Sequence, residues 1–197
     1  MRLESVDVLV VGGGPAGVAA AVSAKGRSPD ARVALVSSEP THYMRPAVTA
    51  LIEDPSLSED RITSFDPVKL LEFGVEPFTR AKVLEVDSDG ARARGPWGEV
   101  AFEFSSLVLA TGGKPFVPPV EGAGLDGVMS VRTIREARRL ASKISPGIRL
   151  VVVGAGLAGV KLALASHSRG ADVTIVEMKN VLWTCLLYTS DAADERY

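Results

Sequence analysis

One stretch near the N-terminus constrains the fold more than any other. An apolar run over residues 8–11 leads into Gly12-Gly13-Gly14-Pro15-Ala16-Gly17, and an alanine-rich segment follows. This order is typical of a buried parallel strand, a tight turn and a helix packed close to the sheet. The turn and the helix N-terminus direct backbone N–H groups and a positive dipole end at one point, which suits a pyrophosphate. We expect Gly12 to make the turn, Gly14 to leave room for the phosphate and Gly17 to let helix and strand approach.

A single Gly-x-Gly-x-x-Gly is a weak indication, because glycine-rich turns also occur in other α/β proteins. The same pattern returns, however, after the apolar run 149–153. Its members are Gly154, Gly156, Leu157, Ala158 and Gly159. A helix to about residue 168 and a strand over 172–177 are expected to follow. That strand ends in Glu177, and a carboxylate there binds a free ribose 2′-OH and repels a 2′-phosphate, so it favours NADH over NADPH.

The first copy has no acid at the equivalent point. Its second strand, 32–37, ends in Ser37, and Glu39 comes two residues later. Alternation directs both side chains to one side, so either could meet the ribose, and Ser38 lies between them. We favour Glu39. The alternative is that Glu39 is a solvated loop acid.

The following loop contains two further polar candidates. Arg45 precedes Pro46 at the start of a short helical segment, where its guanidinium could pair with a cofactor phosphate. His42 is expected to be a solvated loop histidine rather than a catalytic residue. His167, late in the second helix, is expected to be a favourable C-terminal cation or a packing residue.

Between the two glycine motifs the pattern changes to short strands. Runs at 75–80 and 82–87, a turn at 88–90, and runs at 91–94 and 99–104 predict an antiparallel meander inserted as a sheet. A parallel strand over 107–109 then ends in Ala110-Thr111-Gly112. The proline-rich stretch 115–119 is a natural domain crossing, so we expect domains at 1–115 and 116–184.

Composition narrows the class. The chain has 197 residues, 46% of them hydrophobic, and a formal net charge of −2. Nothing in this balance favours nucleic acid or an anionic membrane, and no apolar run approaches the ~20 residues of a membrane span. The N-terminus leads directly into the first strand, so we expect a cytoplasmic protein. We expect no metal site.

Residues 185–197 do not continue the preceding pattern. They resemble a translated sequencing adapter, and we treat them as a non-native tail, the alternative being a short natural one. The tail contains Cys185, the single cysteine of the chain. The rest of the chain therefore has no thiol chemistry of its own.

Two glycine motifs with an Ala-Thr-Gly strand end between them are far more specific than either alone. The chain resembles the FAD-dependent pyridine nucleotide oxidoreductases, which include NADH oxidases and rubredoxin and ferredoxin reductases. The resemblance implies an α/β protein: a FAD-binding Rossmann-like domain with an inserted antiparallel meander, then the first βαβ of a Rossmann-like NAD-binding domain. It also implies that residues 110–112 pass the flavin and that the backbone of Val83 contacts the adenine.

Three departures from the family accompany this resemblance. Residues 46–51 contain no redox cysteine, so thiol chemistry is not expected. Lys161 stands where many members have an acid. The resemblance stops after the first βαβ of the NAD domain, and a later flavin-binding segment and an interface domain are missing. We therefore expect this chain alone to lack turnover.

For the full-length parent, the resemblance implies hydride transfer from NADH to FAD and on to an unidentified acceptor, a small molecule or a redox protein. The parent could be a homo-oligomer. We name no catalytic side chain, because the cofactor performs the redox step. Two alternatives remain open: a FAD-dependent dehydrogenase or oxidase of amine or opine type, and a non-catalytic partial cofactor-binding module.

Overall fold

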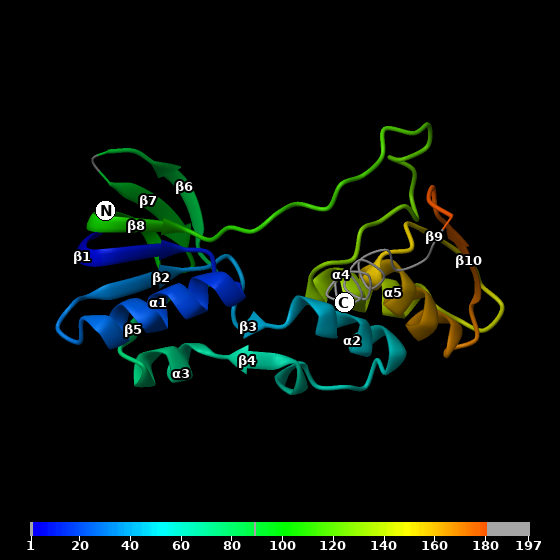
Figure 1. Cartoon of the computed structure of the whole chain (residues 1–197), viewed down its shortest axis with the longest axis horizontal. Coiled ribbons are helices and arrows are strands. Elements are labelled where there is room, and N and C mark those ends of the chain that lie inside the picture. The colour runs from blue at the N-terminus through cyan, green and yellow to red at the C-terminus, as the bar shows by residue number, and fades with distance from the viewer. Residues whose placement is uncertain (1, 89, 181–197) are drawn as a thin grey trace, which may run out of the picture. The chain divides into compact units, whose positions relative to one another are not determined.

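The computed structural model describes residues 2–88 and 90–180, which form two compact units (Figure 1). The first unit comprises Met1–Met44 and Ile62–Lys114, and the second comprises Arg45–Arg61 and Pro115–Tyr197. The predicted tail at 185–197 lies outside the described residues. Each unit is described separately below.

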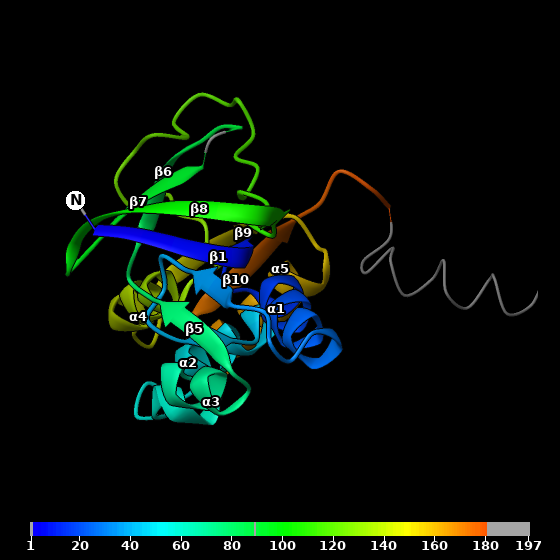
Figure 2. The same ribbon diagram turned by 90° about the vertical axis from the view of Figure 1, so that its left-hand side faces the viewer.

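The first unit is built on a six-stranded sheet with the order β5-β2-β1-β8-β7-β6. The pairings of β5 with β2, β2 with β1 and β1 with β8 are parallel, whereas those of β8 with β7 and β7 with β6 are antiparallel. The order of the strands can be followed in Figure 2. The strands are β1 (Arg2–Val11), β2 (Val33–Val36), β5 (Val75–Phe78), β6 (Lys82–Val86), β7 (Ala91–Gly95) and β8 (Gly98–Leu109). The unit also contains α1 (Pro15–Arg27), α3 (Pro67–Glu72) and the antiparallel pair β3 (His42–Tyr43) and β4 (Thr63–Phe65).

The predicted meander is present as β6, β7 and β8, but two details of the prediction are wrong. The run at 75–80 is not a meander strand, because Val75 to Phe78 pairs in parallel with β2. Val75 is fully buried, and its strand is the outermost strand of the parallel sheet, next to β2. The runs at 99–104 and 107–109 are one strand, β8, which pairs with β7 at its start and with β1 along its length. The meander therefore continues the parallel sheet.

Alternation along β1 and β2 gives the sheet of the first unit two apolar faces. Leu9, Val11 and Val36 face a cluster that includes Phe102 of β8. On the other face, Val10 and Leu35 pack with residues of the two helices, namely Val18 and Ala21 of α1 and Leu70 of α3. The carboxyl ends of β1 and β2 are thereby fixed against α1.

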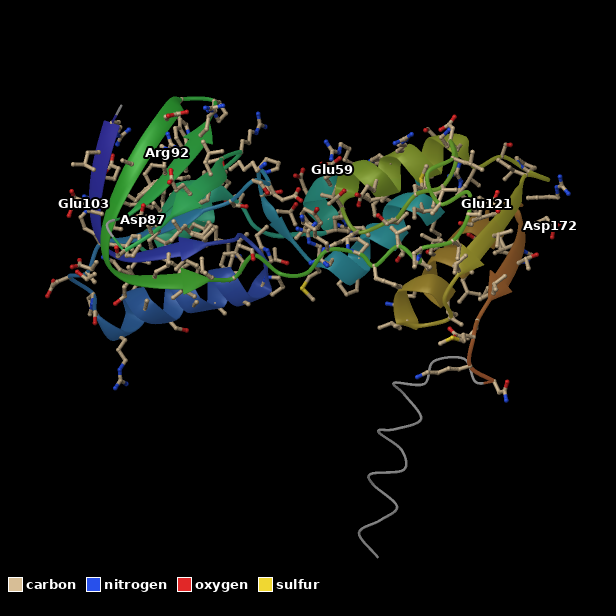
Figure 3. The ribbon with its side chains drawn as sticks, turned by 90° about the horizontal axis from the view of Figure 1, so that it is seen from above. Glu59, Asp87, Arg92, Glu103, Glu121 and Asp172 are labelled. Atoms are coloured by element: carbon tan, nitrogen blue, oxygen red, sulfur yellow. The ribbon has the colours of Figure 1, made fainter. Side chains whose placement is uncertain are left out.

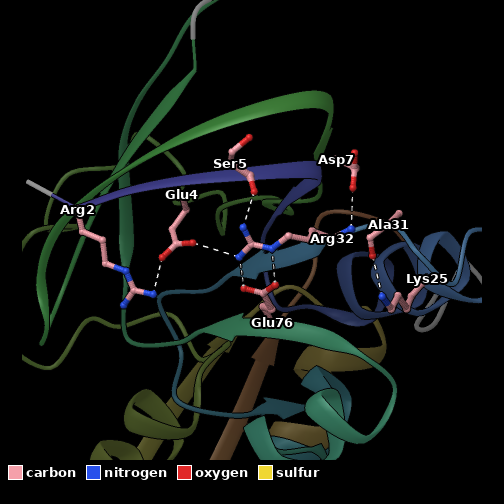
Figure 4. Close-up of polar contacts among 8 residues, drawn as sticks. All are labelled: Arg2, Glu4, Ser5, Asp7, Lys25, Ala31, Arg32 and Glu76. Carbon is pink, nitrogen blue, oxygen red and sulfur yellow. Dashed lines mark hydrogen bonds and ion pairs between the residues drawn. The ribbon is translucent and has the colours of Figure 1, made fainter.

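At the opposite ends of these strands, Arg32 joins β1, β2 and β5 (Figure 4). Its guanidinium donates to both carboxylate oxygens of Glu76, at 3.0 and 2.9 Å, and to the Ser5 carbonyl at 2.7 Å. It also pairs with the buried carboxylate of Glu4 at 3.2 Å. Hydrogen bonds to Glu76 and then Glu4 raise the pKa of Arg32. The network joins the amino-terminal ends of these three strands, at the side of the sheet opposite to the glycine turn.

The second unit contains a parallel pair of strands, β9 (Arg149–Val153) and β10 (Asp172–Val176), connected through α5 (Leu157–His167). It also contains α4 (Ile134–Lys143) and a segment with η1 (Arg45–Thr49), α2 (Ala50–Glu53) and η2 (Glu59–Arg61). Helix α4 begins with a complete capping box. Thr133 accepts from the Glu136 N–H at 3.2 Å, and the Glu136 carboxylate accepts from the Thr133 N–H at 2.8 Å.

Residues 45–61 pack in the second unit, although they lie within the predicted first domain, 1–115. Leu51 and Ile52 of α2 are fully buried, and α2 packs against α4 and α5. Arg169 donates to the carbonyls of Ile52 at 3.2 Å and Ala141 at 2.8 Å, so it joins α2 to the end of α4. The division into two binding domains at residue 115 stays a prediction.

The surfaces of both units carry charged side chains. Exposed examples from different parts of the chain are Glu59, Asp87, Arg92, Glu103, Glu121 and Asp172 (Figure 3). Within residues 2–88 and 90–180, no helix combines the length and the apolar character needed to cross a membrane. The same described residues contain no group of three or more His, Cys, Asp or Glu side chains placed to hold a metal ion.

Candidate nucleotide-binding turns

The first glycine turn joins β1 to α1 at the carboxyl edge of the parallel strands. The Gly12 N–H donates to the Val36 carbonyl at 2.8 Å, and the Ala110 N–H donates to the Val11 carbonyl at 2.8 Å. Gly12 has φ +118°, and a Cβ there would lie 2.2 Å from the Ala110 carbonyl oxygen. Both its conformation and the neighbouring Ala-Thr-Gly strand end therefore require glycine at this position.

The other two glycines of this motif have different surroundings. A Cβ added at Gly17 would lie 1.8 Å from the Gly12 carbonyl oxygen, so α1 approaches β1 as closely as glycine permits. A Cβ added at Gly14 would meet no atom within 4 Å. Gly14 therefore borders open space at the start of α1. This is the arrangement in which a pyrophosphate can approach the backbone.

The N-termini of α1 and α5 differ from those of two other helices. Gly14 and Gly156 occupy their N-cap positions, neither helix has a side-chain cap, and neither has an acid in its first turn. By contrast, Asp66 caps α3, accepting from the Lys69 N–H at 2.8 Å, and Thr133 caps α4. The first-turn N–H groups of α1 and α5 are thus left for a ligand or water to satisfy.

The second turn repeats the geometry of the first. The Gly154 N–H donates to the Val176 carbonyl at 2.8 Å, and Gly154 has φ +100°. A Cβ at Gly159 would lie 2.0 Å from the Gly154 carbonyl oxygen, while one at Gly156 would meet nothing within 4 Å. Leu157 and Ala158, the remaining residues of the motif, open α5.

Glu177 follows β10 and lies directly against the second turn. One carboxylate oxygen accepts from the Ala155 N–H at 2.6 Å and the other from the Lys179 N–H at 3.0 Å. These backbone hydrogen bonds, Ala155 first, lower the pKa of Glu177, so the group is ionised at neutral pH. A negative carboxylate is therefore fixed beside the turn. Its interaction with a ribose stays a prediction.

The corresponding position in the first unit is Ser37, and its environment is different. Ser37 is buried, and a Cβ at Gly13 would lie 2.4 Å from its hydroxyl oxygen. That hydroxyl accepts from the Glu39 N–H at 3.2 Å. Glu39 is half-buried and lines a small cleft with Gly13, Ser37 and His42. Which of residues 37–39 meets a ribose stays a prediction.

The structure distributes the remaining candidates over both units. Thr111 and Gly112 are exposed beyond Ala110, and Val83 lies in β6 at an irregularity of its pairing with β7. Arg45 belongs to the second unit, where its guanidinium donates to the Arg132 carbonyl at 3.4 Å. Lys161 is exposed on α5. Cofactor contacts by these residues stay predictions.

His42 is the residue that sequence reasoning misjudged. It is not solvated: only 7% of its surface is exposed, and its Nδ1 lies 2.6 Å from the Gly13 carbonyl oxygen. The reason is that His42 belongs to the two-residue strand β3, paired with β4. A strand this short leaves no periodic pattern in the sequence. His167 lies, as expected, at the C-terminal end of α5, with Nδ1 3.3 Å from the Ala171 carbonyl oxygen.

Known proteins resemble the chain over most of its length. It is 33% identical over 177 residues to the NADH oxidase of Methanocaldococcus jannaschii, covering 86% of this chain and 40% of that protein. It is 35% identical over 178 residues to the rhodocoxin reductase of Rhodococcus erythropolis, covering 87% and 40%. The chain thus spans about 40% of the length of these relatives.

Solved structures agree with the predicted fold class. A water-forming NADH oxidase from Lactobacillus brevis, bound to NADH, superposes with a TM-score of 0.80 at 21% identity, over 96% of this chain and 45% of that one. A ferredoxin reductase from Rhodopseudomonas palustris gives a TM-score of 0.79 at 25% identity, over 98% and 48%. The α/β, Rossmann-like prediction is confirmed.

The family model described as pyridine nucleotide-disulphide oxidoreductase matches residues 6–193, which is nearly the whole sequence. Together with the two curated relatives, this match confirms the resemblance stated from the glycine motifs. The chain belongs to the pyridine nucleotide-disulphide oxidoreductase family.

Proposed function

We propose that the protein of which this chain forms part is a flavoprotein oxidoreductase that passes hydride from NADH to FAD and on to an electron acceptor. In this proposal the first turn holds the pyrophosphate of FAD and the second turn holds NADH. FAD, when bound, supplies the redox chemistry, and the protein supplies position and electrostatics. The observation that carries the proposal is the pair of glycine turns, each with an open glycine at an uncapped helix N-terminus.

The residues at both turns fit a dinucleotide. Gly14 and Gly156 leave space where a Cβ would otherwise stand. The first turns of α1 and α5 carry no acid that would repel a phosphate. Beside the second turn, the ionised Glu177 suits a free ribose 2′-OH and disfavours a 2′-phosphate, which supports NADH rather than NADPH.

The acceptor is left open by the proposal, because related proteins differ in what they reduce. One relative is named an NADH oxidase and another a rhodocoxin reductase, so both a small molecule and a redox protein remain candidates. A dehydrogenase of amine or opine type would not need the second turn, whose geometry matches the first. A cytoplasmic location and a homo-oligomeric parent stay predictions from the sequence.

The test is FAD and NADH binding by the full 197-residue chain with one substitution in each turn. Gly14→Val should weaken FAD binding by at least tenfold, because its side chain fills the open space at the start of α1. Gly156→Val should weaken NADH binding and spare FAD. Gly26→Val is the matched control, since Gly26 lies at the far end of α1 and is equally open. Absence of FAD binding by the wild-type chain would contradict the assignment.

A further inference from the structure

The proposed function does not account for the burial of His42. This side chain is only 7% exposed and lies 6.2 Å, ring to ring, from Phe65 of β4. Its Nδ1 is 2.6 Å from the carbonyl oxygen of Gly13, the residue immediately before the open Gly14. A buried polar side chain is therefore joined to the backbone of the first turn.

The direction of this hydrogen bond is fixed by chemistry. A carbonyl oxygen can only accept, so the Nδ1 of His42 carries the proton and donates it. The described peptide bonds are all trans, and in a planar trans peptide the C=O and the following N–H point in opposite directions. When the imidazole holds the Gly13 carbonyl on its own side, the Gly14 N–H points to the opposite side.

The second turn is anchored by the opposite kind of group. There the carboxylate of Glu177 accepts from the N–H of Ala155, the residue that corresponds to Gly13. In the first unit Ser37 occupies the position of Glu177, because both residues directly follow the strand paired with the turn. The first turn thus has no carboxylate at this position, and an imidazole donor from β3 contacts the carbonyl of its second residue instead.

We propose that His42 is a positioning residue of the first turn, whose Nδ1–H holds the Gly13–Gly14 peptide so that the Gly14 N–H faces a dinucleotide pyrophosphate. This rests on the proposed function of the first turn. His42 does not touch the ligand and takes no part in electron transfer. It preorganises one backbone donor. Removal of the imidazole should therefore weaken the binding of ligands that carry a pyrophosphate and leave the binding of ligands without one unchanged.

The experiment compares three variants of the full chain by isothermal titration. His42→Leu removes the donor. His42→Asn has nearly the same shape as leucine but places an amide N–H near the position of Nδ1. His167→Leu is the control, because His167 is an exposed histidine in the second unit whose Nδ1 also faces a backbone carbonyl. Each protein is titrated with FAD, ADP and adenosine.

We expect His42→Leu to bind FAD and ADP about fivefold or more weakly, the effect of one ordinary hydrogen bond, and to bind adenosine like the wild type. His42→Asn should remain within about twofold of the wild type, as should His167→Leu. An equal loss for adenosine, or an asparagine variant as weak as leucine, would show that His42 acts only through packing and would overturn the proposal.

A second measurement needs neither ligand nor variant. The ¹⁵N spectrum of the wild-type imidazoles should show His42 with a proton on Nδ1, and an unprotonated Nδ1 refutes the inference directly. If the wild type binds neither FAD nor ADP, the proposed function fails and this inference with it. If the wild type binds both and His42→Leu binds them equally well, only the inference about His42 fails.

Discussion

Replacing Gly17 by alanine should destabilise the first unit, whereas the same change at Gly14 should not, although both glycines belong to one motif. At Gly17 the new Cβ would lie 1.8 Å from the Gly12 carbonyl oxygen, which is backbone and cannot rotate away. Helix α1 would have to move away from β1. Val18, the next residue, and Ala21, one turn further on, are buried against the sheet and oppose that movement.

The magnitude follows from the cost of overpacking a filled interior, typically 1–3 kcal/mol and more against backbone. We therefore expect Gly17→Ala to lose about 3 kcal/mol of unfolding free energy. With a urea m-value on the order of 2 kcal/mol/M, the unfolding midpoint should fall by about 1.5 M. At Gly14 nothing lies within 4 Å and φ is −78°. Alanine is a poorer N-cap than glycine, but it also reduces the conformational entropy of the unfolded chain. These effects oppose each other, so the unfolding free energy should change by no more than about 0.5 kcal/mol.

The assay is urea unfolding followed by tryptophan fluorescence. The chain has two tryptophans, so a Trp183→Phe background leaves Trp97 as the reporter. Trp97 belongs to the first unit and packs edge-on against Phe78, with ring centroids 5.7 Å apart. Equal midpoints for Gly17→Ala and the background protein would refute the reasoning. A large loss for Gly14→Ala would equally show that its surroundings are not open.

Two further predictions concern the second unit. Glu177→Ala should lower the ratio of the NADPH dissociation constant to the NADH dissociation constant, because it removes the carboxylate beside the turn. A wild-type chain that binds NADPH more tightly than NADH would mean that this carboxylate faces away from the ribose. Thr133→Ala should lower the unfolding free energy of the second unit by about 1 kcal/mol in thermal or urea unfolding, because α4 loses its cap. Ser142→Ala, on the exposed side of the same helix, should be nearly neutral. Equal stability of the two variants would contradict the importance of the capping box.

The parts of the fold that depend on local sequence could be predicted. Both glycine turns, the strands leading into them and the helices after them follow from spacing alone, because a turn between a buried strand and a closely packed helix requires glycine at fixed positions. The contact between Gly12 and Ala110 could not be derived from spacing. The family resemblance suggested only that residues 110–112 lie near the flavin.

The parts of the fold that depend on long-range pairing could not be predicted from the sequence. The run containing Val75 has the composition of a meander strand, and only its burial beside β2 makes it part of the parallel sheet. Likewise, the loop position of His42 indicated solvent, yet pairing of β3 with β4 buries it under the turn. Residues 45–61 lie within the predicted first domain in sequence but pack through Leu51 and Ile52 on α4 and α5. In each case a partner far along the chain decides the outcome.

The two turns share three glycines but differ at their second residue, and the difference follows from the residue after the neighbouring strand. Ser37 stands 2.4 Å from where a Gly13 Cβ would be, so the first turn needs a fourth glycine there. At the second turn Ala155 keeps its Cβ, and its N–H binds Glu177. The second turn therefore has an ionised carboxylate, that of Glu177, fixed against its backbone. Under the proposed function, discrimination against a ribose 2′-phosphate by a fixed charge belongs to the NADH site, whereas the first site relies on the shape of its turn, held from the carbonyl side by His42.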